Sequence, residues 1–217
     1  MNPIPEPPTV VQPMGMKTNS LTVTRALPSP HRRIRLVLVD DHPAVLAGLE
    51  GLLADQPGLD VVAAVATAPE AYEVVLRHRP DLAILDYHLP GEDGVSLCYR
   101  LKILPMPPQA LILSAFADDA LALMALVAGA DGVISKGAPT DLYDTATALV
   151  AGETRLPEIS PSVLRASGLK LEAEDLPILG MLVHRVPPDD IADTLNISPA
   201  RLALRRWRIL ERLRHRA

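Results

Sequence analysis

The 217-residue sequence has few features of a membrane protein or of a secreted protein held by disulfides. No apolar run approaches the roughly 18–20 residues that span a bilayer, and the N-terminus lacks the apolar core of a secretory signal. The single cysteine, Cys98, excludes an internal disulfide. These absences indicate a soluble protein of a reducing compartment, and we expect it in the cytoplasm.

Charge is distributed unevenly along the chain, behind a net charge of −5. Residues 34–150 hold sixteen acidic side chains against six Lys and Arg, whereas residues 201–217 hold seven Arg against one Glu. An acidic body joined to a basic end suggests two tasks on one chain. The basic end is the candidate for contact with phosphates.

Residues 34–151 carry the pattern of an α/β domain. Five short apolar runs alternate with stretches of helical periodicity, and continuous apolarity is typical of strands covered on both faces of a parallel sheet. The runs lie at residues 36–39, 61–65, 82–85, 110–113 and 132–134. They predict a doubly wound, five-stranded parallel sheet with right-handed crossovers, which gathers ligands at the C-terminal strand ends.

The segments on either side of this domain have different compositions. Residues 1–33 contain seven prolines and predict a disordered extension. Residues 152–168 contain glycine and proline breakers, Pro161 among them, and predict a linker. Residues 169–217 predict a small all-α domain, with helical stretches near 171–185, 189–195 and 199–214.

Polar residues follow the predicted strands at the edge where a parallel sheet gathers its C-terminal ends. Asp40 and Asp41 follow the first strand, Asp86 ends the third, Ser114 the fourth and Lys136 the fifth. Three clustered carboxylates repel one another unless a divalent cation offsets them, and Mg²⁺ prefers hard oxygen ligands. A lysine and a hydroxyl opposite can hold the oxygens of a phosphoryl group. This set favours phosphoryl transfer to a carboxylate.

The surroundings of these positions resemble the four motif blocks of bacterial receiver domains, in the same order and at the same spacing. The blocks read VDDHP at 39–43, ILDYHLPG at 84–91, LSA at 113–115 and ISK at 134–136. The resemblance implies a flavodoxin-like receiver over about 34–150, phosphorylated on Asp86 by a sensor histidine kinase. It also implies that Asp40, Asp41 and Asp86 hold Mg²⁺, together with the main-chain carbonyl of His88.

The same resemblance implies that Ser114 moves toward the phosphoryl group and that Lys136 pairs with it. One position departs from the family pattern, because Val133 stands where receivers usually carry an inward-turning Tyr or Phe. An alternative for the strand-end acids is that they only cap the helices that follow. A nucleotide site is disfavoured because no glycine-rich phosphate loop follows the first strand.

Residues 190–198 resemble the second helix and turn of helix-turn-helix domains of the NarL/FixJ (LuxR-like) class. The resemblance implies that the next helix enters the major groove of DNA. Arg201, Arg205, Arg208 and Arg212 recur at i, i+4, i+7 and i+11 and share one face of that helix. Such a face suits DNA phosphates or guanine edges.

The helix-turn-helix resemblance has departures that leave two functions open. Arg201 and Arg205 replace the usual Thr and His, and the sequence ends at Ala217, where the class continues into a dimerising helix. We therefore expect a homodimer formed through the receiver. The first hypothesis is a response regulator that controls transcription by binding DNA; the second is a phosphorylation-dependent regulator whose helical module binds another protein. An enzyme with its own substrate is disfavoured, because the pocket turns over only its own aspartyl phosphate.

Overall fold

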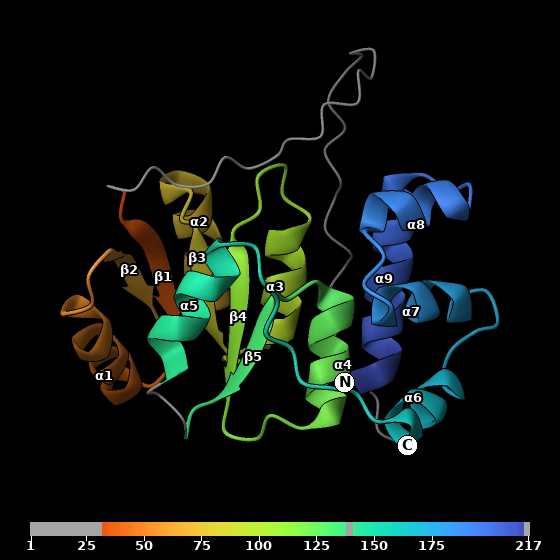
Figure 1. Cartoon of the computed structure of the whole chain (residues 1–217), viewed down its shortest axis with the longest axis horizontal. Helices are drawn as coiled ribbons and strands as arrows, with labels where there is room; N and C mark the ends of the chain where they lie inside the picture. Colours follow the sequence, from red (N-terminus) through yellow and green to blue (C-terminus); the bar gives the residue numbers. More distant parts are fainter. Residues whose placement is uncertain (1–31, 138–140, 215–217) are drawn as a thin grey trace, which may run out of the picture.

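A computed structural model describes residues 32–137 and 141–214 (Figure 1). Its centre is a parallel sheet of five strands in the order β2-β1-β3-β4-β5. The strands are β1 (Ile34–Val39), β2 (Leu59–Val65), β3 (Leu82–Asp86), β4 (Gln109–Ser114) and β5 (Gly132–Ser135). The predicted doubly wound, five-stranded parallel sheet is confirmed, with a flavodoxin-like strand order.

Helices cover both faces of the sheet (Figure 1). One layer contains α1 (Pro43–Ala54) and α5 (Leu142–Val150); the other contains α2 (Ala68–His78), α3 (Gly94–Lys102) and α4 (Asp119–Ala128). Because side chains of a strand alternate between faces, Leu38 lies in the core under α1 and α5, and Val39 lies in the core under the other layer. The sheet is therefore buried on both sides, as the unbroken apolar runs predicted.

Helix α4 is apolar almost all round. It begins at Asp118, whose carboxylate accepts a hydrogen bond from the Leu121 N–H at 2.8 Å, and it ends at Gly129, whose φ of 87° is left-handed. Every residue from 121 to 128 except Met124 is buried. A helix of this kind needs cover on the side away from the sheet as well.

That cover comes from the C-terminal helices, which are α6 (Pro161–Gly168), α7 (Leu176–Val183), α8 (Pro188–Thr194) and α9 (Pro199–Arg214). Figure 1 shows α9 running beside α4. Helix α8 packs on α9, and α7 packs on α4 and α8. Trp207, Ile209 and Leu210 of α9 belong to the same continuous core as the buried residues of α3 and α4. The receiver-like domain and the helical module are thus packed together through α9.

The segment expected as a linker contains a helix, α6. Pro161 was interpreted as a breaker, but it occupies the first helical position, where proline lacks only an N–H that no helix bond needs. Ser160 caps this helix, accepting a hydrogen bond from the Val163 N–H at 3.5 Å. The predicted extension lies outside the described residues up to position 31. Within the described part of the chain, no helix is long and apolar enough to cross a bilayer.

Candidate functional site

The C-terminal ends of β1, β3 and β5 bring two aspartates and a lysine into contact. Lys136 Nζ lies 2.6 Å from Asp40 Oδ2 and 2.9 Å from Asp86 Oδ2. Both carboxylates are buried, with 0% and 2% of their side chains exposed, so little solvent screens these pairs. Burial alone lowers the pKa of Lys136, but hydrogen bonds to the two carboxylates outweigh it and raise that pKa. The lysine is therefore held as a cation between two anions.

Asp41 and His42 complete the acidic side of this cluster. The Asp40 carboxylate accepts a hydrogen bond from the His42 main-chain N–H at 2.9 Å, and His42 Nδ1 lies 2.7 Å from Asp41 Oδ1. Ligand atoms of these three residues and Asp86 all lie within 4.8 Å of one another. Asp41 Oδ1 is buried, and among the described residues it has no hydrogen bond of acceptable geometry, although the His42 ring lies beside it. A hard divalent cation fits this donor set, because it binds carboxylate oxygens and offsets their charge.

Ser114 lies at the end of β4, next to Asp86 in the sheet order. Its side chain is buried and bonds to the chain two residues later: Oγ donates to the Phe116 carbonyl at 3.0 Å and accepts from the Phe116 N–H at 3.2 Å. The Ser114 carbonyl in turn accepts a hydrogen bond from the Lys136 N–H at 2.8 Å. The hydroxyl is thus beside the cluster, and turning it toward Asp86 requires it to leave Phe116.

Gly94 is part of the site but is not among the residues predicted for it from the sequence. A β-carbon at this position would lie 2.1 Å from the main-chain oxygen of Asp86, so only glycine lets α3 begin this close behind the strand. The Gly94 N–H also donates to the Tyr87 carbonyl at 2.9 Å. The signal in the sequence was a glycine placed directly after Asp93, which caps α3.

His88 follows Asp86 by two residues, and its ring is exposed and packs edge-on against Tyr87 at 4.6 Å. Its main-chain carbonyl as a metal ligand stays a prediction. Val133 is buried in β5 beside Ile112 of β4. Phe116, two residues after the end of β4, has a side chain that is 80% exposed.

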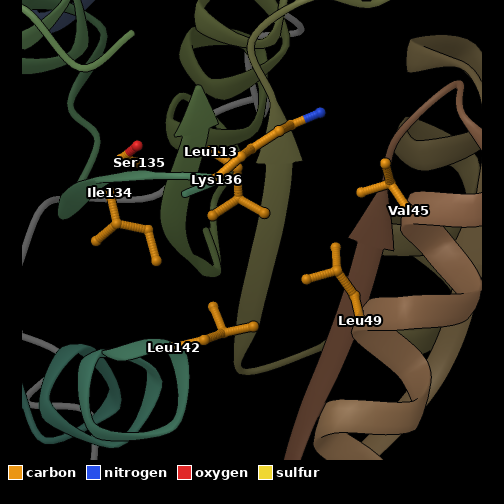
Figure 2. Close-up of a pocket in the computed structure, with 7 residues that line it drawn as sticks. All are labelled: Val45, Leu49, Leu113, Ile134, Ser135, Lys136 and Leu142. Carbon is orange, nitrogen blue, oxygen red and sulfur yellow. The ribbon is translucent and has the colours of Figure 1, made fainter. Parts of the chain in front are cut away.

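An apolar hollow of about 50 Å³ lies under Lys136, between α1, α5 and the sheet (Figure 2). Figure 2 shows the lysine amino group pointing away from the aliphatic side chains that line the hollow. The lining residues are Val45, Leu49, Leu113, Ile134, Ser135, Lys136 and Leu142. The hollow is too small for a substrate and forms a low-dielectric floor beneath the charged cluster.

Comparison with known proteins decides the family of this fold and cluster. Residues 36–147, about half of the chain, match the family model of the response regulator receiver domain. The chain belongs to this family. The cluster around Asp86 is therefore to be compared with the acidic pocket of receiver domains.

Relatives of this response regulator include DNA-binding proteins. It is 40% identical over 103 residues to the DNA-binding transcriptional activator DevR/DosR of Mycobacterium tuberculosis, covering 48% of each chain. It is 25% identical over 191 residues to the response regulator UvrY of Escherichia coli, covering 83% of this chain and 88% of UvrY. Alignments with DevR/DosR and with the oxygen regulatory protein NreC of Staphylococcus epidermidis span about half the length of those relatives.

Solved structures agree with this assignment. A LuxR-family response regulator from Aurantimonas sp. has 34% identity and a TM-score of 0.55, over 61% of this chain and 94% of that one. The response regulator RcsB in complex with DNA shares the fold at 24% identity and a TM-score of 0.55, over 84% of this chain and 92% of RcsB. The shared fold thus extends beyond the receiver into the C-terminal helices.

One side of α9 lies on the receiver. The Tyr99 hydroxyl donates to the Ala203 carbonyl at 2.5 Å, and the Tyr99 and Trp207 rings lie 5.4 Å apart. Arg206 donates from Nε and Nη2 to the Val127 carbonyl, at 3.0 and 2.8 Å, and so binds the C-terminal end of α4, where helix carbonyls lack partners. Burial lowers the pKa of Arg206.

The last turn of α9 is fixed to the start of α3. Arg214 Nη2 lies 3.0 Å from Asp93 Oδ1 and also donates to the Ser96 hydroxyl. Its guanidinium lies 5.6 Å from the centre of the Trp207 ring. Asp93 caps α3 directly after the loop that follows Asp86, so α9 is bonded to the two helices that follow the strands ending in Asp86 and Ser114.

The four arginines proposed to contact DNA divide into two pairs. Arg205 is buried and lies 2.5 Å from Glu174 Oε2, and Arg212 pairs with Glu172. The hydrogen bond from Arg212 lowers the pKa of Glu172. Arg201 and Arg208 are exposed and have no ion pair among the described residues. Their role in DNA binding stays a prediction for all four.

Proposed function

We propose that this protein is a two-component response regulator that accepts a phosphoryl group on Asp86 from a sensor histidine kinase and controls transcription through its C-terminal helices. The observation that carries the proposal is Lys136 held between the buried carboxylates of Asp40 and Asp86. A lysine cation beside a buried nucleophile suits phosphoryl transfer, which depends on positioning and on neutralising charge.

The chemistry proposed is displacement at phosphorus. The Asp86 carboxylate forms the new O–P bond while the P–N bond of a phosphohistidine breaks and the imidazole nitrogen leaves. The Lys136 ammonium binds one phosphoryl oxygen, and the Ser114 hydroxyl, released from Phe116, binds another. Asp40, Asp41 and Asp86, with the His88 carbonyl, would hold Mg²⁺, which would supply the remaining positive charge. Hydrolysis of the acyl phosphate restores Asp86.

The module proposed to bind DNA comprises residues 169–217, joined to a receiver at 34–151 by residues 152–168. Two observations support DNA as its partner: the basic outer face of α9, and relatives named as DNA-binding transcriptional regulators. We infer that phosphorylation changes the contact of α9 with α3 and α4, or receiver dimerisation, and through these DNA binding. A homodimer that used the side of α4 facing away from the sheet requires α9 to move, because α9 covers that side.

A second function is favoured by one observation. Arg205 and Arg212 are engaged by Glu174 and Glu172, which weakens the arginine face as a phosphate-binding surface. In this alternative the protein is a phosphorylation-dependent regulator whose helical module binds another protein.

Selection of DNA from a random pool distinguishes the two functions. The protein is used with Asp86 phosphorylated, verified by intact mass, and without phosphorylation. We expect enrichment of a sequence family and a change in its recovery on phosphorylation. Failure to enrich any sequence in either state, with Asp86 phosphorylated, would leave the receiver in place and replace DNA by a protein partner.

A further inference from the structure

Helix α9 carries two stripes of residues with the same spacing. Arg201, Arg205, Arg208 and Arg212 form the outer stripe; Ala203, Trp207, Leu210 and Arg214 form the inner stripe, two residues further along at every step. Two residues of an α-helix correspond to a rotation of about 200° around its axis. The two stripes therefore lie on nearly opposite sides of α9.

The inner stripe is occupied by the receiver. The Ala203 carbonyl accepts a hydrogen bond from the Tyr99 hydroxyl, and Trp207 packs on the Tyr99 ring. Arg214 forms an ion pair with Asp93. Trp207 and Leu210 have exposed fractions of 9% and 0%. Only the two ends of this side, at Ala203 and Arg214, keep partial exposure while α9 is docked.

The outer stripe remains open in the same docked arrangement. It borders a hollow of about 400 Å³ lined by Glu174, Ala200, Arg201, Leu204, Arg205 and Arg208. Arg201 and Arg208, about two turns apart, are exposed at its edges. The buried Arg205 guanidinium lies between them with Glu174.

We propose that this outer face of α9 binds the sugar–phosphate backbone of duplex DNA while the inner face stays docked on the receiver. The inference rests on the proposed function, in which the C-terminal helices bind DNA, and it adds where first contact occurs. DNA binding through Arg201 and Arg208 then needs no release of α9. Phosphorylation controls a later step, such as base reading or dimerisation, rather than access to this face.

The ion pairs of the outer face set the strength of this contact. Glu174 and Glu172 neutralise Arg205 and Arg212, which leaves Arg201 and Arg208 to meet phosphates. With two phosphate contacts, the slope of log affinity against log salt concentration should be about −1.8. Replacing Glu174 by Gln removes the carboxylate that neutralises Arg205, while the guanidinium keeps its hydrogen bond to the main-chain carbonyl of residue 174, and should steepen the slope to about −2.7.

The test uses the full-length unphosphorylated protein and its single tryptophan, Trp207, which reports on the docked face. A short random-sequence DNA duplex carrying a dye is titrated at several salt concentrations, and anisotropy gives the affinity. Acrylamide quenching of Trp207 is measured with and without saturating duplex. Tyr99→Ala removes the ring and hydroxyl that hold α9, so its Trp207 quenching is the reference value for an α9 that has left the receiver.

We expect the duplex to bind without any increase in Trp207 quenching. The double variant with Arg201→Gln and Arg208→Gln should lose binding and its salt slope should fall toward zero, whereas the exposed Arg165→Gln on α6 should behave as the parent. Binding accompanied by Trp207 quenching like that of Tyr99→Ala overturns the inference and leaves the proposed DNA function standing. No binding by the parent or by Glu174→Gln, together with no enrichment from the random pool, overturns both.

Discussion

Lys136 is the residue on which the charge balance of the site depends. Its ammonium group pairs with two carboxylates that are almost fully buried, and removing one partner of such a contact leaves an uncompensated buried charge. We expect Lys136→Met to lower the free energy of unfolding by roughly 2–3 kcal/mol, since the lysine keeps some exposure to solvent. Urea denaturation measures this loss, with the exposed Lys170→Met as the control.

Magnesium and pH give this prediction two further readouts. Millimolar Mg²⁺ should return part of the lost stability, because the cation replaces the missing positive charge. The pKa of Lys136 is raised in the folded state, so its contribution is fully present below the unfolded lysine pKa of about 10.4 and is lost as pH rises through the higher folded value. The stability difference between parent and Lys136→Met should therefore hold from pH 7 to about pH 10 and shrink above it. A difference that vanishes near neutral pH contradicts the pairing.

Asp41 carries the prediction for metal binding. Its buried Oδ1 lies against the His42 ring without a hydrogen bond of acceptable geometry among the described residues, and it is within reach of the other carboxylates. We expect Asp41→Ala to abolish Mg²⁺ binding in titration calorimetry, while Asp60→Ala, an exposed acid of β2, binds as the parent does. Unchanged Mg²⁺ affinity in Asp41→Ala would show that Asp41 is not a metal ligand and only lies near the start of α1.

Single residues also show what the sequence could foretell. Asp40, Asp86, Ser114 and Lys136 could be brought to one edge from the pattern alone, because the C-terminal ends of parallel strands meet there. The pairing of Arg205 with Glu174 could not, because 31 residues separate them and nothing local fixes which glutamate the arginine meets. Helical spacing placed Arg205 on a basic face and said nothing of its partner.

At the scale of elements, the contact between α4 and α9 depends on a glycine. Gly129 ends α4 with φ of 87°, and a β-carbon there would lie 2.9 Å from Arg206 Nη2. Gly152 ends α5 with a similar φ of 92° and open space around it. Substituting Gly152 therefore adds backbone strain alone, whereas substituting Gly129 adds the same strain and a clash with Arg206 of the docked helix.

We expect Gly152→Ala to cost about 1–2 kcal/mol of unfolding free energy, the strain of a left-handed residue. Gly129→Ala should cost the same and in addition disturb Arg206, so Trp207 emission and acrylamide quenching of the native protein should change in this variant alone. Equal native fluorescence in both variants would show that Arg206 is not held at the end of α4 as described.

Elements were predictable where the pattern was local and strong. The five strands follow from unbroken apolar runs, whereas α6 was missed because Pro161 stops a helix in most positions and starts one here. The sequence of α4 also carries a signal for the docking of another helix. Nine apolar residues from 120 to 128 with no polar face require cover on both sides, and the second cover is α9 together with α7.

For the whole molecule, one core joins the receiver to the C-terminal helices. Buried residues of α3 and α4 are continuous with Trp207, Ile209 and Leu210. We therefore expect a single cooperative unfolding transition, in which Trp207 emission and far-UV circular dichroism change at the same urea concentration. Arg206→Ala removes two hydrogen bonds of the contact and should move the Trp207 transition to lower urea than the circular dichroism transition. Separate transitions in the parent would contradict a shared core.

The docking of the helical module is the part of the molecule that the sequence did not reveal. It depends on pairs such as Tyr99 with Ala203 and Arg206 with Val127, which are 104 and 79 residues apart. A polar residue that will bind a distant carbonyl has the same local pattern as a solvated one. Charge composition indicated two parts with different tasks, but it did not predict that these two parts pack against each other.

The most direct test of a phosphorylation-controlled regulator is the site of phosphorylation itself. The full-length protein is incubated with acetyl phosphate and Mg²⁺, and intact mass is recorded for the parent, for Asp86→Asn and for the parent with a chelator. We expect the mass of one phosphoryl group on the parent with Mg²⁺ and none in the other two samples. Equal labelling of Asp86→Asn, or labelling that persists without a divalent cation, would contradict the assignment of Asp86 and its acidic neighbours as the phosphoacceptor site.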